Sequence, residues 1–140
     1  VNVGNGGVIS CDLKELMDFP FRLLEADHIT CAGITEEIKN APSILSETIS
    51  ACVYLKKELD EVFHEDKRGV NVILKTENPK IMAQELRSFL TVHNGGMISK
   101  CPRYDRVMDK GIALEIKNLN TRCLTQVNLD QMISIVNNLG

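Results

Sequence analysis

Aromatic side chains are scarce in this chain of 140 residues, which has no tryptophan, two tyrosines and four phenylalanines. Proteins that bind single-stranded nucleic acid usually stack the bases on exposed aromatic rings, so this scarcity argues against that function. Hydrophobic residues make up 44% of the chain and charged residues 25%, as in a soluble globular protein of about one domain. The core must therefore be built from aliphatic side chains, methionine and cysteine.

A dense group of basic residues is also missing. The net charge is −3, and the densest basic groups are Lys67 with Arg68 and Arg103 with Arg106. Because phosphate contacts dominate the affinity of proteins for duplexes, nucleic acid is not indicated as a partner. No apolar run is long enough to span a bilayer. The amino terminus also lacks the charged and then apolar pattern of a signal sequence. We expect no membrane association.

The five cysteines cannot all pair within one chain, because their number is odd. This favours a reducing compartment, and we expect an intracellular location in the cytoplasm or nucleus. The first residue is valine, so the chain is interpreted as a fragment of a larger protein. The sequence contains no Gly-x-Ser-x-Gly, His-Glu-x-x-His, EF-hand, P-loop or Rossmann pattern. We therefore expect no cofactor and no metal.

The chain contains one eight-residue sequence motif twice. Residues 3–10 return 89 positions later as residues 92–99, with six of the eight positions identical. Both copies include Asn-Gly-Gly, and the correspondence extends to Cys11 with Cys101 and Cys31 with Cys123. Self-similarity of this kind predicts a repeated structural unit. The glycines are interpreted as sharp reversals with positive φ rather than as a phosphate-binding loop.

The repeat suggests one domain over residues 1–140 with an internal pseudo-twofold axis. Its units are residues 3–64 and 92–140, each a strand-strand-helix unit, with a strand and helix inserted at residues 69–91. The alternative is a tandem repeat that the chain ends interrupt. Expected strands lie at residues 7–11, 21–25, 29–31, 70–75, 97–101, 110–117 and 121–126.

Helices are expected where apolar residues recur every three or four positions. One helix should begin at Thr35 and stop or kink at Pro42, and the longest should cover residues 43–65. Asn78 and Pro79 should open another helix that ends near residue 92, and Asn128 should cap the last one. The fold class is therefore α+β. We expect a mixed or mostly antiparallel sheet of five or six strands, covered on one face by three or four helices.

The repeated cysteines at positions 11, 31, 101 and 123 could in principle hold zinc, but no two of them lie close in sequence. Small buried apolar residues are the preferred interpretation, and Cys52 on the long helix is also expected in the core. The histidines are far apart and suggest no catalytic group.

One short pattern resembles the metal-dependent nuclease motif PD-(D/E)xK. It consists of Asp105 or Asp109, followed on the expected next strand by Glu115 and Lys117. In such nucleases two carboxylates hold Mg²⁺ and the lysine positions water. The proline-aspartate of the motif is absent here, since Tyr104 precedes Asp105. Nuclease activity is therefore the alternative hypothesis, and no residue is assigned as catalytic.

The preferred hypothesis is a protein-protein interaction or assembly domain without catalytic activity. A protein partner or self-association as a homodimer is expected, because the long helix has an apolar stripe wide enough for a core and a partner. A small-ligand sensing domain, with a pocket between the repeat units, is a further alternative. The expected interface residues are Leu45, Ile49, Leu55, Leu59, Val62 and Phe63.

Overall fold

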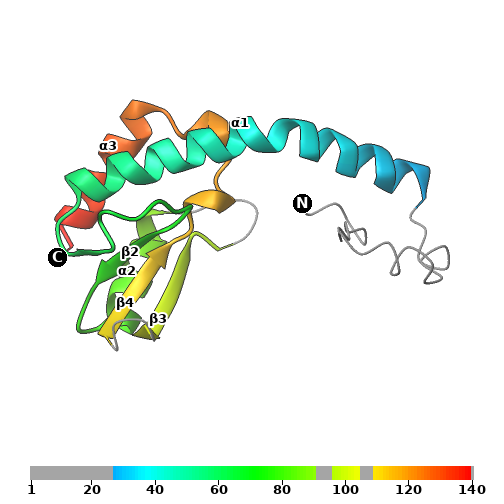
Figure 1. Ribbon diagram of the computed structural model, residues 1–140. Coiled ribbons are helices and arrows are strands. Elements are labelled where there is room, and N and C mark those ends of the chain that lie inside the picture. Colours follow the sequence, from blue (N-terminus) through cyan, green and yellow to red (C-terminus); the bar gives the residue numbers. More distant parts are fainter. Residues whose placement is uncertain (1–26, 91–95, 105–108, 140) are drawn as a thin grey trace. The chain divides into compact units, whose positions relative to one another are not determined.

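The structure is a computed structural model, and it describes residues 27–90, 96–104 and 109–139 (Figure 1). The first copy of the repeated motif and the first half of the second lie outside the described residues, as do the strands expected at 7–11 and 21–25. The internal duplication therefore stays a prediction.

The chain divides into two compact units, Val1–Ser43 and Ile44–Gly140. In the first unit the described residues are 27–43, and from His28 onward they belong to helix α1 (His28–Glu58). The second unit contains the later part of α1, the sheet and two further helices.

The sheet of the second unit is antiparallel. The described residues give it four strands, in the order β1-β2-β4-β3. Their bounds are Val62–Phe63 for β1, Val72–Lys75 for β2, Ile98–Tyr104 for β3 and Asp109–Leu114 for β4. Leu114 lies opposite Val72 on one side and Ile98 on the other, so β4 runs through the middle of the sheet. The expected antiparallel sheet is confirmed.

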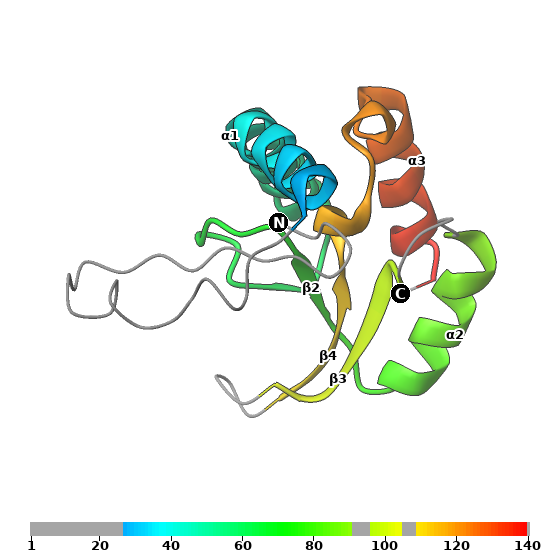
Figure 2. The ribbon, with the colours of Figure 1, turned by 90° about the vertical axis from the view of Figure 1, so that its right-hand side faces the viewer.

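The two faces of the sheet have different neighbours, because successive side chains of a strand point to opposite sides. Val72 and Leu74 of β2 and Ile112 and Leu114 of β4 are fully or almost fully buried in the main core. Figure 2 shows helices α2 and α3 on one side of the sheet and the loop after β1 (green) on the other.

Helices α2 (Pro79–Phe89) and α3 (Gln126–Asn137), together with the later part of α1, complete the core. Two short 3-10 helices, η3 (Ile116–Asn118) and η4 (Thr121–Cys123), connect β4 to α3. The α+β fold with helices on a sheet is therefore confirmed. The buried helical side chains are Ala51, Cys52, Leu55, Leu59, Ala83, Leu86, Leu129, Met132 and Val136.

Helix α1 differs from the expectation at its start and at its middle. The strand expected at residues 29–31 is wrong, because this segment is already helical. Asp27 begins the helix: its Oδ1 accepts hydrogen bonds from the amides of Ile29 and Thr30, both at 2.9 Å. The helix also continues through Pro42, so the stop expected there is wrong, although proline has no N–H to donate to Ile38.

Helix α1 ends earlier than expected, at Glu58. The next residues, which were expected to be helical, form the short strand β1, and Glu61 and His64 on either side of it both have positive φ.

Two other expected elements also differ. Residues 121–126 do not form a strand, because Asn120 accepts a hydrogen bond from the Arg122 amide and starts η4. Helix α3 begins at Gln126, and its cap is Thr125, which accepts from the Asn128 amide, rather than Asn128 itself.

Acidification is expected to loosen the first turn of α1. Hydrogen bonds from Thr30, backbone first and side chain second, hold the pKa of Asp27 below its usual 3.8. The folded state therefore binds this proton more weakly than the unfolded state does. The stabilisation is fully present above the unfolded pKa and is lost as the pH falls through the lower folded pKa. The protection factors of the Ile29 and Thr30 amides, which are their NMR exchange rates relative to those of an unfolded peptide at the same pH, should fall across this range on acidification.

The control is Asp27→Ala, which removes the capping oxygen at every pH. The protection factors of its amides at positions 29 and 30 should already be low at neutral pH, and acidification should not lower them further. If these protection factors in the native chain do not change as Asp27 is protonated, the assignment of Asp27 as the helix cap is wrong.

Candidate functional site

Helix α1 carries a stripe of side chains at three- and four-residue intervals. The stripe contains Thr48, Cys52 and Leu55 and continues at Leu59, the first residue after the helix, and all four are buried in the second unit. The hydroxyl of Thr48 donates to the carbonyl of Ile44 at 2.8 Å, so the polar group of this residue is satisfied within the helix. This part of the stripe is core.

One turn earlier the same stripe is exposed. Leu45 is 50% exposed and its neighbour Ile44 47%. All residues from 35 to 47 are exposed, so the helix has no buried face over this stretch. Ile38, also exposed, continues the spacing toward the amino terminus. An apolar stripe that is core from Thr48 onward and exposed at Leu45 and Ile38 is typical of a helix that meets a partner.

The residues predicted for an interface fall into two groups. Leu55, Leu59 and Phe63 are buried within the chain, and Ile49 and Val62 are half-buried. Leu45 is the exposed member of the set. A buried side chain offers a partner little surface, so we define the candidate interface, called the α1 patch, as Ile44 and Leu45.

The residues of the nuclease pattern are only partly described. Asp105 lies outside the described residues. The strand expected at residues 110–117 ends at Leu114, so Glu115 precedes η3 and Lys117 lies within it. Lys117 Nζ is 3.2 Å from Glu115 Oε2, and the two side chains form an ion pair. Ile116, which lies between them, is fully buried in the core.

The cysteine interpretation is partly wrong. Cys52 is buried as expected, and burial raises the pKa of its thiol to about 11, so it is protonated at neutral pH. Cys31 and Cys123, by contrast, are exposed, on a helix and a 3-10 helix respectively. Within the described part of the chain, no three histidine, cysteine or acidic side chains are grouped so that they could hold a metal ion.

The positive φ expected at the glycines of the repeated motif is also wrong at Gly96, the one of them that the structure describes. Gly96 does not have the left-handed φ that was expected of a sharp reversal. Its carbonyl accepts a hydrogen bond of 2.8 Å from the side-chain amide of Asn118. This bond connects the start of β3 to η3.

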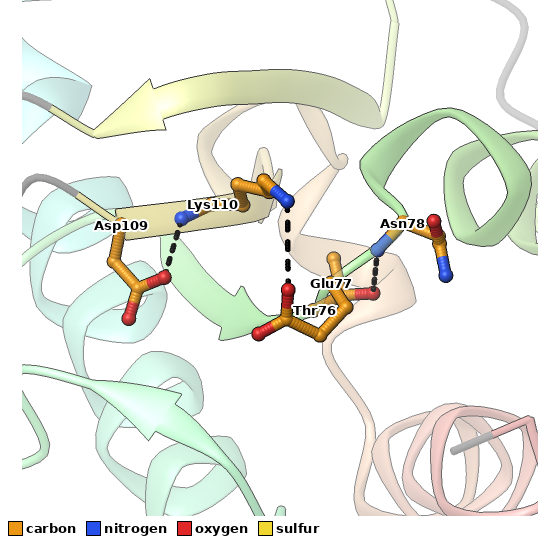
Figure 3. A network of polar contacts seen from close by, with 5 residues as sticks. All are labelled: Thr76, Glu77, Asn78, Asp109 and Lys110. Atoms are coloured by element: carbon orange, nitrogen blue, oxygen red, sulfur yellow. Dashed lines mark hydrogen bonds and ion pairs between the residues drawn. The ribbon is translucent and has the colours of Figure 1, made fainter.

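An acidic hollow of about 440 Å³ lies where β2, α2 and the end of α3 meet. Asp60, Glu61, Glu77 and Glu85 line it, and all four are exposed. Lys110 reaches Glu77 at 3.5 Å, and its own amide donates to Asp109, as Figure 3 shows. In the same figure, the amide of Asn78 donates to the hydroxyl of Thr76. These carboxylates are exposed to solvent, so we interpret the network as the polar edge of the hollow rather than as a binding site.

The model of the MJ1341 family C-terminal domain matches residues 42–137. The chain belongs to this family. The matched segment begins next to the boundary between the two units and ends with the last residue of α3. It therefore contains the α1 patch, the sheet and most of the lining of the acidic hollow. No curated protein and no solved structure matches the chain.

The helices of the described residues were also compared with the requirements for crossing a membrane. No stretch of helix in the described part of the chain has the length and hydropathy that crossing a bilayer requires.

Proposed function

We propose that this chain is a non-catalytic interaction module that associates with a second copy of itself through the α1 patch. The observation that supports this proposal is the stripe on α1, which is core from Thr48 onward and exposed at Leu45. Burying the exposed halves of Ile44 and Leu45 would contribute roughly 1 kcal/mol each per copy.

The helix itself would also benefit from a partner. Isolated helical segments are marginally stable, because most helix stability in proteins comes from the packing of an apolar face. Residues 35–47 have no such packing, and Pro42 removes one backbone hydrogen bond among them. A second helix against this segment would supply the missing contacts.

The charges near the patch favour a second copy over a strongly charged partner. Residues 42–46 contain no charged side chain. Two copies can therefore bring this segment together about a twofold axis without like-charge repulsion, although the chain as a whole is negative. The nuclease alternative requires Glu115 and Lys117 on one strand, whereas β4 ends at Leu114 and Lys117 lies within η3.

Sedimentation equilibrium over a range of micromolar concentrations tests the proposal. The native chain should form dimers, and the double variant Ile44→Asp with Leu45→Asp should stay monomeric, because dimerisation would bury four carboxylates. The control is Val127→Asp on α3, since Val127 is 64% exposed and lies on a different helix. This variant should dimerise like the native chain.

Two results would reject the proposal. A native chain that sediments as a monomer even at millimolar concentration does not self-associate. A double variant that dimerises with native affinity, while its circular dichroism is unchanged, would show that the α1 patch is not the contact.

A further inference from the structure

A second hollow, of about 360 Å³, lies where the loop after β1 meets the beginning of β2. Its lining includes the cationic or titratable side chains Lys56, His64, Lys67 and Arg68, and it contains no aspartate or glutamate. We call it the Lys56 pocket. It lies within the second unit, away from the α1 patch.

Lys56 is the buried charge of this pocket. It is only 6% exposed, and its Nζ donates to the carbonyls of His64 at 2.9 Å and Lys67 at 2.8 Å. The amide of Lys67 donates to the His64 carbonyl at 3.1 Å, so the ammonium group bridges the two ends of one turn. Carbonyl oxygens satisfy two of its donors but do not neutralise its charge. Among the described residues, no carboxylate forms an ion pair with it.

Two more cations surround this centre. Arg68 is exposed and makes no ion pair within the described part of the chain. Lys67 is paired with Asp66 at 2.8 Å, and this partner raises the pKa of Lys67, so its charge is already matched. Two positive charges, those of Lys56 and Arg68, are thus left for an anion.

The backbone adds donors. Strand β1 is two residues long and pairs with Ile73 and Leu74, so it ends before it reaches Asn71. Alternate amides of a strand point to the same edge, and the Lys75 amide donates to Glu61 across this edge. The amide of Asn71 therefore faces the place where β1 is missing, and it has no backbone acceptor among the described residues.

The remaining wall suits an organic group. Phe63, Val70 and Ile73 give one side of the pocket an apolar surface. The side-chain oxygen of Asn71 is buried and has no hydrogen-bond partner among the described residues. Such an acceptor is satisfied by a hydroxyl or amine of a ligand.

We propose that the Lys56 pocket binds a small organic phosphate, whose phosphoryl group lies between Lys56, Arg68 and the Asn71 amide and whose body lies against Phe63 and Ile73. Two uncompensated cations match the double negative charge of a phosphate monoester. The pocket is larger than a phosphate ion requires, which leaves room for the organic part.

Titration of the full 140-residue chain with phenyl phosphate, followed by NMR, tests the assignment. Amide signals of Arg68 and Asn71 should shift with saturation at millimolar ligand, beyond the effect of sodium chloride at equal ionic strength. Arg68→Gln should weaken binding about tenfold, because a charged hydrogen bond to the phosphate is lost. Lys57→Gln is the matched control, since Lys57 is the exposed neighbour of Lys56, and it should bind like the native chain.

Lys56→Met should abolish binding, but it also removes the two hydrogen bonds of the turn. Arg68→Gln, whose side chain has no partner to lose among the described residues, is therefore the deciding variant. Native signals that do not move, or equal affinities of the native chain and Arg68→Gln, would overturn the site. Inorganic phosphate that binds as tightly as phenyl phosphate would overturn the organic part of the assignment.

Discussion

Replacement of Leu114 by alanine is expected to lower the free energy of unfolding by about 2–5 kcal/mol. Leu114 is fully buried on β4, the central strand, with Val72 and Ile98 opposite it on the two neighbouring strands. Removing its branched end leaves a cavity that neighbours on both sides border, so collapse from one side cannot fill it. The loss is a large fraction of the 5–15 kcal/mol that stabilises a typical domain.

Urea unfolding monitored by far-ultraviolet circular dichroism measures this change. The matched control is Ile81→Ala, which also removes apolar carbon, but from a side chain of α2 that is 56% exposed. The control should change stability by less than about 1 kcal/mol. Similar losses in both variants would mean that Leu114 does not lie at the centre of the core.

Gly111→Ala is expected to destabilise the sheet by about 1–3 kcal/mol. A Cβ atom at this position would lie 2.7 Å from the carbonyl oxygen of Leu74, and 3.4 Å from side-chain atoms of Ile73 and Phe63. The oxygen belongs to the backbone of β2, which pairs with β4 at this point. It cannot move away without disturbing the ladder between the two strands.

Thermal unfolding compares this variant with Gly96→Ala. A Cβ at Gly96 meets no atom within 4 Å, so this control should unfold close to the native temperature. If both variants unfold like the native chain, then β2 and β4 are not as close at Gly111 as the structure places them.

The elements that could be predicted are those whose signals are local. Asn78 and Pro79 mark the start of α2, and the apolar run at residues 70–75 marks β2, since a capping position and a buried strand both appear in a few consecutive residues. The antiparallel sheet and the helices that cover it follow from the number and order of such segments.

The elements that could not be predicted depend on competition between local and distant interactions. Ile29 and Thr30 are β-branched and favour a strand by propensity, but the carboxylate of Asp27 caps a helix over them. Strand β1 exists because β2 lies beside it, and two residues carry no period of their own. Thr121 lies in a 3-10 helix because of a hydrogen bond made by Asn120.

The two candidate sites differ in the same way. Leu45 was predicted, because its three- and four-residue spacing from the core positions of α1 is visible in the sequence. Lys56 was missed, because its role depends on two carbonyls of a loop that follows the helix. A signal was present nonetheless: Lys56 lies four residues after Cys52 and three before Leu59, and a lysine on the buried face of a helix needs acceptors nearby.

Tyr54 makes the packing of α1 against α3 visible to spectroscopy. Its hydroxyl donates to Asp130 Oδ1 at 2.6 Å, and this bond raises the pKa of the phenol. The chain has no tryptophan and two tyrosines, so its near-ultraviolet absorption comes almost entirely from this residue and one other. The pH at which the tyrosine absorption changes therefore reports whether Tyr54 of α1 still contacts Asp130 of α3, and this measurement requires no attached dye.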